Sequence, residues 1–396
     1  MESSAPSPYV VVVRGFARAG TVWAWLIRRE AVTRQGRAMR DTGCEMPAVG
    51  RGRELPAVPL FEVEAPAAET LMRLAPDRLE SLVAHGRRRY GDVALALGDR
   101  ATWRWLETTE NPYRSEIGGV RRRLGRPGAV VLNMSYEWCC SAGVGPDPAG
   151  TGNRMLRTLD WPLHGLGGAV VVARQEGVVG PYYNVTWPGY VGVLTAMAPG
   201  RFSAAINQPP LRRFTRSCRF DWLLGRLAIW RRNGLPPSHL LRRVFDECRN
   251  YRDAKRMLVE TPLCVPAFFS LSGCAAGEGC VIERLETTAM VHEAPFCITN
   301  HWVGLGRSGH DRGNDSIGRR ASMQRVLADA GDAFSWLAAP TLNRHTRLVV
   351  VANAARCLLS VQGWEKDGPA TAVFTLPRPT EAAADATYRG VRRLPA

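Results

Sequence analysis

The sequence predicts an α+β fold built on antiparallel sheets, and three observations support this prediction. Apolar residues recur at spacings of three and four through 55–124 and again in segments of 219–260, which is the helical pattern. Runs rich in β-branched and aromatic residues fill the chain between and after these stretches. The elements follow one another as blocks of strands and blocks of helices, and this order favours layered antiparallel sheets over strict βαβ alternation.

The composition is that of a globular protein. The chain has 396 residues, 45% of them hydrophobic, which can fill one large domain or two ordinary ones. The formal charge is +16, but the basic residues are almost all arginine and are scattered, with lysine only at Lys255 and Lys366. We therefore expect a dispersed solvated surface and no nucleic-acid partner. The ten cysteines are spread thinly, and we expect most to be reduced and buried.

Residues 1–52 are rich in arginine and glycine and are predicted to form a basic N-terminal extension. The segment carries Glu2 where a secretory signal has basic residues, and its apolar run is short. No apolar stretch approaches the roughly 18 residues of a membrane span. These features lead us to expect a cytoplasmic protein.

The first half of the chain is predicted to change from helix to strand. Helices are expected in 55–124, followed by a β-rich run over 128–140. A loop over 145–152 separates this run from the next strands. Those strands are predicted at 154–161, 168–174, 190–197 and 201–207.

The second half repeats the order. Helical segments are expected in 219–260, with Ser238 as the N-cap of the segment 239–248. A further helix is expected near 322–331. Strands are predicted at 267–273, 280–285, 289–294 and 296–300, with a last β-rich part at 346–361.

Motifs for cofactors and metals are weak. The sequence GLGRSG at 304–309 matches G-x-G-x-x-G, but no amphipathic helix follows it, so a plain loop is favoured. Cys274 and Cys280, with His292 and Cys297 nearby, lack the tight pairs of a zinc site and are better explained as thiols lining a hairpin. We expect neither a cofactor nor a metal.

The adjacent cysteines Cys139 and Cys140 are the candidate for chemistry. No histidine has an obvious partner spacing for a Cys–His dyad, yet a cysteine nucleophile needs a group to take its proton. If the bond before Cys140 were cut, the freed α-amine, with a pKa of about 7.7–8.0, would be that base. Arg157 could then stabilise the thiolate and Asp160 orient the amine, provided that one of them lies where the strand ends. The alternative is an inert pair of core thiols followed by a surface ion pair.

The order of several motifs resembles the acid ceramidase and N-acylethanolamine-hydrolysing acid amidase family of N-terminal-nucleophile hydrolases. The similarity extends over about 55–365. The matching segments are N-x-x-Y-E before the cysteines, Cys-Ser, Arg-x-x-Asp, GYVGVLTAMAPGRFSAAINQ, YRDAKRMLVETPL, GEGCVIER, Thr299-Asn300, Arg319-Arg320 and PTLNRHT. The resemblance implies a four-layer αββα sandwich with a helical N-terminal segment.

The resemblance also implies a self-cleaving precursor. Cleavage after Cys139 would expose Cys140 as the nucleophile, with Arg157 and Asp160 supporting its thiol and amine. Residues 53–139 would then be a helical fragment that stays associated with the catalytic domain, 140–396.

Further site residues follow from the same resemblance. Asn300 would donate to the oxyanion, the backbone N–H of Asn207 would be the second donor, and Arg319 would be an active-site arginine. Three departures bear on this reading, and one is Thr158, which replaces the family's asparagine between Arg157 and Asp160. The cysteine-to-arginine spacing is one residue longer here, and Gln208 stands where the lysosomal members have glutamate, which places their acid-pH control in doubt.

The implied activity is hydrolysis of a linear amide bond in an N-acylated lipid or another N-acyl amine. Peripheral contact with an anionic membrane would suit the basic surface and a lipid substrate. Two alternatives remain open at this point. One is acyl transfer from the same cysteine thioester, and the other is a non-catalytic member that uses the fold for binding.

Overall fold

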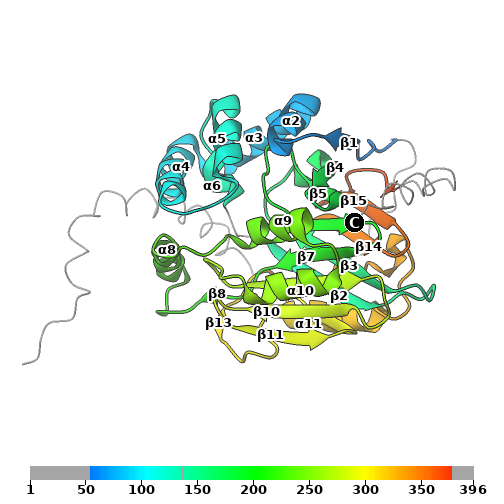
Figure 1. Ribbon diagram of the computed structural model, residues 1–396. Helices are drawn as coiled ribbons and strands as arrows, with labels where there is room; N and C mark the ends of the chain where they lie inside the picture. The colour runs from blue at the N-terminus through cyan, green and yellow to red at the C-terminus, as the bar shows by residue number, and fades with distance from the viewer. Residues whose placement is uncertain (1–53, 135–137, 377–396) are drawn as a thin grey trace, which may run out of the picture.

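The computed structural model describes residues 54–134 and 138–376, and Figure 1 shows its ribbon. The expected extension 1–52 lies outside the described residues, as do Tyr136 and Glu137 of the N-x-x-Y-E motif. In the part that is described, no helix is long and apolar enough to cross a membrane.

Two large sheets form the centre of the molecule. The first has eight strands in the order β1-β4-β5-β6-β7-β9-β10-β11. Only its β1–β4 pair is parallel. The strands are β1 (Leu60–Val63), β4 (Val171–Gly177), β5 (Gly180–Thr186), β6 (Thr195–Ala198), β7 (Phe202–Asn207), β9 (Ala267–Gly273), β10 (Gly279–Arg284) and β11 (Ala289–Glu293).

The second sheet runs β12-β2-β3-β14-β15-β16, and β17 also pairs with β15. All of its pairs are antiparallel. Its strands are β2 (Cys139–Pro146), β3 (Asn153–Asp160), β12 (Phe296–Ile298), β14 (Thr346–Asn353), β15 (Leu358–Glu365), β16 (Gly368–Pro369) and β17 (Phe374–Thr375). A separate two-stranded sheet pairs β8 (Leu211–Arg212) with β13 (Gly309–His310).

Helices cover the outer face of each large sheet. On the first sheet, Phe245 of one covering helix shares a buried cluster with Phe269 of β9. On the second, Met323 shares a cluster with Leu156 of β3. The covering helices are α9 (Pro237–Glu247) and α10 (Tyr251–Glu260) on the first sheet and α11 (Ser316–Val326) on the second.

The two sheets pack face to face through an apolar core. Leu159 of β3 and Val350 of β14 belong to the same buried cluster as Phe268 and Val281 of the first sheet. Burial of this kind stabilises the fold by roughly 25 cal/mol per Å² of apolar surface. The layers therefore run helix, sheet, sheet, helix, which confirms the predicted αββα sandwich.

The N-terminal part is helical, as predicted, and lies as a group beside the sandwich, coloured blue to cyan in Figure 1. Its helices share a buried cluster that includes Leu106, Ile117 and Val130. They are α2 (Ala67–Leu74), α3 (Pro76–Tyr90), α4 (Asp92–Glu107), α5 (Arg114–Leu124) and α6 (Ala129–Asn133), and two further helices, α7 (Leu166–Ala169) and α8 (Cys218–Ile229), occur later in the chain.

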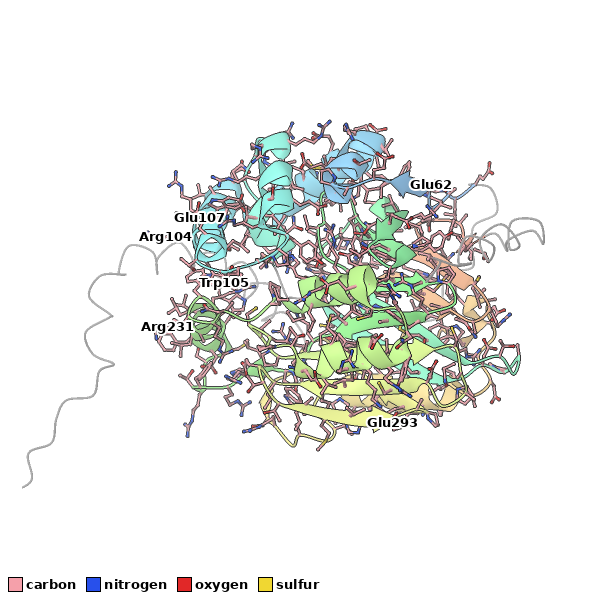
Figure 2. All side chains as sticks on the ribbon, viewed as in Figure 1. Glu62, Arg104, Trp105, Glu107, Arg231 and Glu293 are labelled. Carbon is pink, nitrogen blue, oxygen red and sulfur yellow. The ribbon has the colours of Figure 1, made fainter. Side chains whose placement is uncertain are left out.

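Helix α8 stands apart from the sandwich, facing α4 (Figure 1). Figure 2 places Trp105 of α4 near Arg231, which follows α8. Trp105 Nε1 donates a hydrogen bond to the carbonyl oxygen of Arg232 at 3.2 Å. The helical N-terminal segment is thus tied to the later part of the chain.

The prediction of a β-rich run over 128–140 is wrong for its first half, where α6 forms. The Asp99 carboxylate in α4 accepts the backbone N–H groups of Gly128, Val130 and Val131, at 2.8 to 3.1 Å. These are the N–H groups that a helix start leaves unpaired. A cap supplied from another helix has overridden the strand preference of the valines.

Other local predictions also need correction. The segment 55–124 contains β1 as well as helices, and 190–197 is strand only from Thr195 onward. The N-cap of α9 is Pro236, so Ser238 lies inside the helix. Helix α11 begins at Ser316, earlier than the expected 322.

Candidate active site

Strands β2 and β3 place the candidate nucleophile beside its expected helpers. In their antiparallel register, Cys139 lies opposite Asp160 and Cys140 lies opposite Leu159. Because side chains alternate along a strand, Cys140 faces the core between the sheets and Cys139 faces the other way. Cys140 is fully buried and Cys139 is partly buried.

Arg157 lies on the same inter-sheet face as Cys140. Its Nη2 donates to Cys140 Sγ at 3.3 Å. Its Nη1 donates to the carbonyl oxygen of Ile206 at 2.8 Å and to Asn207 Oδ1 at 3.0 Å. The guanidinium is fully buried, so its two nitrogens join β3 to the end of β7 and direct positive charge at the thiol.

Asp160 is the last residue of β3, which is the strand-end position expected for one helper. Its side chain lies on the opposite face from that of Arg157. Asp160 accepts hydrogen bonds from Thr346 Oγ1 and Asn343 Nδ2, both at 2.9 Å. Its Oδ2 lies 3.8 Å from Arg319 Nη1. The carboxylate is therefore held beside the start of β2 by three groups.

Asn300 contacts the backbone of the candidate nucleophile directly. Two residues past the end of β12, its Oδ1 accepts the backbone N–H of Cys140 at 3.0 Å and Arg319 Nη2 at 2.8 Å. Its Nδ2 donates to the carbonyl oxygen of Gln208 at 2.7 Å. Since an amide nitrogen carries two hydrogens, one remains available for a developing oxyanion.

Arg319 of α11, in the outer helix layer, also contacts Cys140. Its Nη1 donates to the Cys140 carbonyl oxygen at 2.8 Å and to Ser141 Oγ at 3.0 Å. Its Nε donates to the carbonyl oxygen of Asn314 at 2.8 Å. Cys140 is therefore contacted at its amide, its carbonyl and its thiol by three different side chains.

Asn207, the last residue of β7, is the remaining predicted site residue. Besides accepting from Arg157, it donates through Nδ2 to the carbonyl oxygens of Ile298 and Thr299, at 3.1 and 3.2 Å. This links the first sheet to the strand that leads to Asn300. The structure thus brings together every site residue that the sequence nominated.

The raised pKa of Cys140 indicates that its thiol is protonated before reaction. Burial, opposed by Arg157 and Arg319, raises the pKa of Cys140 to about 11. Burial and the Asp160 charge raise the pKa of Cys139 to about 12. Burial also raises the pKa of Asp160, although Arg319 opposes it. Attack by Cys140 therefore requires proton removal during the reaction, with arginine charge at hand to stabilise the thiolate.

Sequence reasoning missed the partners of these residues. Asn343 and Thr346, which hold Asp160, lie within the PTLNRHT segment, and their polar side chains after a turn were the available signal. Ser316 and His301 adjoin Asn300, and nothing local in the sequence marks them.

The weaker motifs lie elsewhere. The GLGRSG segment is largely exposed loop that ends at β13. Cys280 and His292 lie on adjacent strands β10 and β11. Across 54–134 and 138–376, no group of three or more His, Cys, Asp or Glu side chains is arranged to hold a metal ion.

The chain is similar in sequence to acid ceramidases, which confirms the resemblance predicted above. No protein-family model matches it. The acid ceramidase of Bos taurus is 36% identical over 251 residues, covering 57% of this chain and 59% of the relative. That of Homo sapiens is 36% identical over 104 residues, covering 25% of this chain and 24% of the relative. This chain thus spans less than two thirds of the length of these relatives.

Two solved structures are also similar. An N-acylethanolamine-hydrolyzing acid amidase ortholog of Caenorhabditis elegans has a TM-score of 0.43 at 20% identity, covering 60% of this chain and 100% of that chain. Penicillin V acylase from Agrobacterium tumefaciens has a TM-score of 0.34 at 15% identity, covering 60% of this chain and 86% of that chain.

Proposed function

We propose that this protein is an amidohydrolase that cleaves a linear amide bond in an N-acyl lipid or another N-acyl amine. Its nucleophile would be Cys140, exposed as an N-terminal residue by self-cleavage after Cys139. The observation that carries the proposal is the convergence of Arg157, Asn300 and Arg319 on the thiol, amide and carbonyl of Cys140. The sequence similarity to acid ceramidases supports the substrate class.

Self-cleavage would begin with attack of Cys140 Sγ on the carbonyl carbon of Cys139. A C–S bond forms, the C–N bond breaks, and the thiol proton passes to the leaving nitrogen, which becomes an α-amine. Water then hydrolyses the thioester and leaves a carboxylate on Cys139. Arg157 would stabilise the thiolate character of the attacking sulfur.

Substrate hydrolysis would repeat this chemistry on an external amide. The α-amine of Cys140 takes the thiol proton, the thiolate attacks the substrate carbonyl, and the amine of the substrate leaves with that proton. Asn300 Nδ2 and the backbone N–H of Asn207 would hold the oxyanion, and loss of one such donor typically costs about 10²–10³ in rate. Water activated by the α-amine would then release the acid.

The two fragments, ending at Cys139 and beginning at Cys140, would stay together because much of their contact is buried. Asn133 Nδ2 donates to the carbonyl oxygen of Gly189 at 2.9 Å, and its Oδ1 accepts the backbone N–H of Val191 at 2.8 Å. These bonds anchor the end of α6 on the larger fragment.

Contact with an anionic membrane would use the α8 region. Phe214 is 48% exposed and Phe220 is 52% exposed, and the exposed arginines Arg213 and Arg216 lie in the same segment of the chain. Exposed aromatic and basic groups together suit an interface with anionic lipid headgroups. Flotation with vesicles of neutral and of anionic phospholipid tests this, and equal flotation of wild type and Phe214→Ser/Phe220→Ser protein would contradict it.

The intact mass of purified protein tests the main proposal. Wild type should give two fragments, the larger beginning at Cys140, while Cys140→Ala should stay whole. Cys139→Ala is the matched control, since it removes the adjacent thiol and should still be cut. Cleaved wild type should release free acid from an N-acylethanolamine or ceramide probe. Uncut wild type without amidase activity from pH 4 to 9 would reject the proposal, and capture of the acyl group by an added amine would reassign it to acyl transfer.

A further inference from the structure

Three hydrogen-bonding side chains surround the backbone of Asn300 and connect it to the start of α11. They are Thr299, His301 and Ser316, which we call the Asn300 clamp. Ser316 Oγ accepts the backbone N–H of Asn300 at 2.9 Å. The same oxygen lies 2.8 Å from His301 Nδ1 and 2.9 Å from Thr299 Oγ1.

One arrangement of hydrogens satisfies every contact in the clamp. Thr299 Oγ1 lies 2.8 Å from the carbonyl oxygen of Ser316, which can only accept, so the threonine hydroxyl donates there. Ser316 Oγ already accepts from Asn300, and its own hydrogen is free to go to His301 Nδ1. Burial and the charges of Arg320 and Arg319 lower the pKa of His301, so the imidazole is neutral and its Nδ1 can accept. Each donor in the clamp then has an acceptor.

The clamp joins two parts of the candidate site. Ser316 is the first residue of α11, and Arg319 lies one turn further along the same helix. Arg319 contacts both Asn300 Oδ1 and the Cys140 carbonyl oxygen. A shift of Ser316 relative to Asn300 would therefore move a guanidinium and an amide that act on the same cysteine.

The start of α11 is itself tightly determined. Its N-cap, Asp315, has a φ of 41°, in the left-handed region that non-glycine residues seldom adopt. The Asp315 carboxylate accepts the backbone N–H of Gly318 at 2.9 Å. Backbone strain of this kind persists where the surrounding structure requires one conformation.

We propose that Ser316 and His301 are positioning residues that set the placement of Asn300 relative to Arg319 and Cys140. They act through the backbone of Asn300 and through α11, and touch no substrate. The expected fall in kcat rests on the proposed function. The hydrogen bonds of the clamp do not depend on it.

Variants at Ser316 separate positioning from folding. Ser316→Ala leaves the buried Asn300 N–H without an acceptor, whereas Ser316→Thr keeps the hydroxyl. We expect Ser316→Ala to lower kcat about 10- to 100-fold with KM within about threefold, because a small displacement of a catalytic group affects the transition state most. Ser316→Thr should recover most of the rate, and Ser308→Ala, at an exposed serine directly before β13, should match wild type.

Two variants at His301 test the same positioning role independently, in case Ser316→Ala fails to fold. His301→Phe removes the Nδ1 acceptor, while His301→Asn keeps a polar atom near its position, so only the former should lose kcat. Titration of active sites normalises each rate to functional protein. If normalised kcat is unchanged in Ser316→Ala, or if Ser316→Thr falls as far as Ser316→Ala, the positioning role is wrong.

Hydrogen exchange distinguishes failure of this inference from failure of the proposed function. The Asn300 N–H should be protected in wild type and in Ser316→Thr and should exchange faster in Ser316→Ala. Fast exchange in wild type would overturn the clamp whatever the activity. Slow exchange in a wild type that neither self-cleaves nor hydrolyses amides would leave the clamp standing and reject the amidohydrolase.

Discussion

Arg157 Nη2 lies 3.3 Å from Cys140 Sγ, inside a core where both side chains are fully buried. A guanidinium at this distance in a region of low dielectric favours the thiolate far more than the same pair would in water. Burial works in the other direction and is the larger effect, since the pKa of Cys140 is raised to about 11. The pair therefore lowers the cost of forming a thiolate without creating one at rest.

Replacing Arg157 should slow self-cleavage and move its pH dependence. In Arg157→Met the pKa of the Cys140 thiol rises further, so the half-time of precursor conversion at pH 7 should lengthen by about tenfold or more. The measurement is fragment formation by mass spectrometry across pH 6 to 10. Arg154→Met is the matched control, because Arg154 is also fully buried in β3 but donates to the carbonyl oxygen of Leu327. Equal pH profiles for the two variants would contradict the assigned role.

We expect the Asp160 carboxylate to lower the unfolding free energy as pH rises and to be needed for the amidase rate. Its folded pKa is raised by burial, so the native state binds a proton more tightly than the unfolded chain does. The resulting stabilisation is present at low pH and is lost as pH rises through the folded pKa. Asp160→Asn avoids that loss, and we expect it to exceed wild type in unfolding free energy by a margin that grows from pH 4 to pH 8. Its amidase rate should fall by roughly 10²-fold, since no carboxylate orients the amine.

Asp147 supplies a control of opposite sign. Burial of this carboxyl is outweighed by hydrogen bonds from Ala149, Asn353 and Arg356, and its pKa is lowered. Its stabilisation is present above the unfolded pKa and is lost as pH falls through the folded pKa. Asp147→Asn should therefore be less stable than wild type at pH 8, with the gap closing in acid. Urea unfolding at several pH values measures both variants, and parallel curves would refute the sign assigned to Asp160.

Much of the fold follows from local pattern. The alternating and β-branched runs predicted β3, β9 and β10 close to their observed bounds, because strands buried on both faces are rich in such residues. The single β-rich part predicted at 346–361 is divided in the structure between β14 and β15. Helix α6 could not be predicted in this way. Its start depends on Asp99, which is 29 residues before the first N–H that it accepts.

The residues of the candidate site could be proposed from the sequence, but their contacts could not. The order of the cysteines, Arg157 and Asp160 marks neighbouring strands, and the resemblance marks Asn300 and Arg319. The bond from the Cys140 amide to Asn300 spans 160 residues, and the bonds that hold Asp160 span more than 180. Only the folded register brings such groups together, so neither the contact of Thr346 with Asp160 nor that of Ser316 with Asn300 could be predicted from the sequence.

Gly143 of β2 is expected to be sensitive because it lets α11 approach the sheet. A Cβ at this position would lie 3.0 Å from both Cys297 Sγ and Leu327 Cδ1, and 3.2 Å from Met323 Cγ. Gly143→Ala should cost about 1–3 kcal/mol of stability by overpacking. It should also slow self-cleavage, since α11 carries Arg319. Gly168→Ala, with open space around the added methyl group, should change neither quantity. If Gly143→Ala cleaves itself at the wild-type rate, the packing of α11 on β2 does not affect the rate of self-cleavage.

The interface between the two proposed fragments contains a buried ion pair. Arg242 Nη1 of α9 lies 2.6 Å from Glu116 Oε2 of α5, and the side chains are only 11% and 10% exposed. The other oxygen of Glu116 accepts the backbone N–H of Ala68 at 2.9 Å. One carboxylate thus joins two helices of the N-terminal segment to the sandwich.

Breaking this ion pair should destabilise the association of the two cleaved fragments more than it destabilises the uncleaved precursor. Glu116→Gln removes the nearer of the two counter-charges of Arg242, whose Nε also lies 3.7 Å from Asp246 Oδ2. Loss of this charged hydrogen bond costs about 1.5–3 kcal/mol, and after cleavage no covalent bond compensates. We expect the fragments of Glu116→Gln to separate at lower urea than those of wild type, as seen by size-exclusion chromatography. Glu247→Gln breaks the exposed pair with Arg243 on the same helix and should cost less than about 1 kcal/mol. Fragments that separate at the same urea concentration in both variants would show that the apolar contacts of α5 and α6 hold the two parts together without the ion pair.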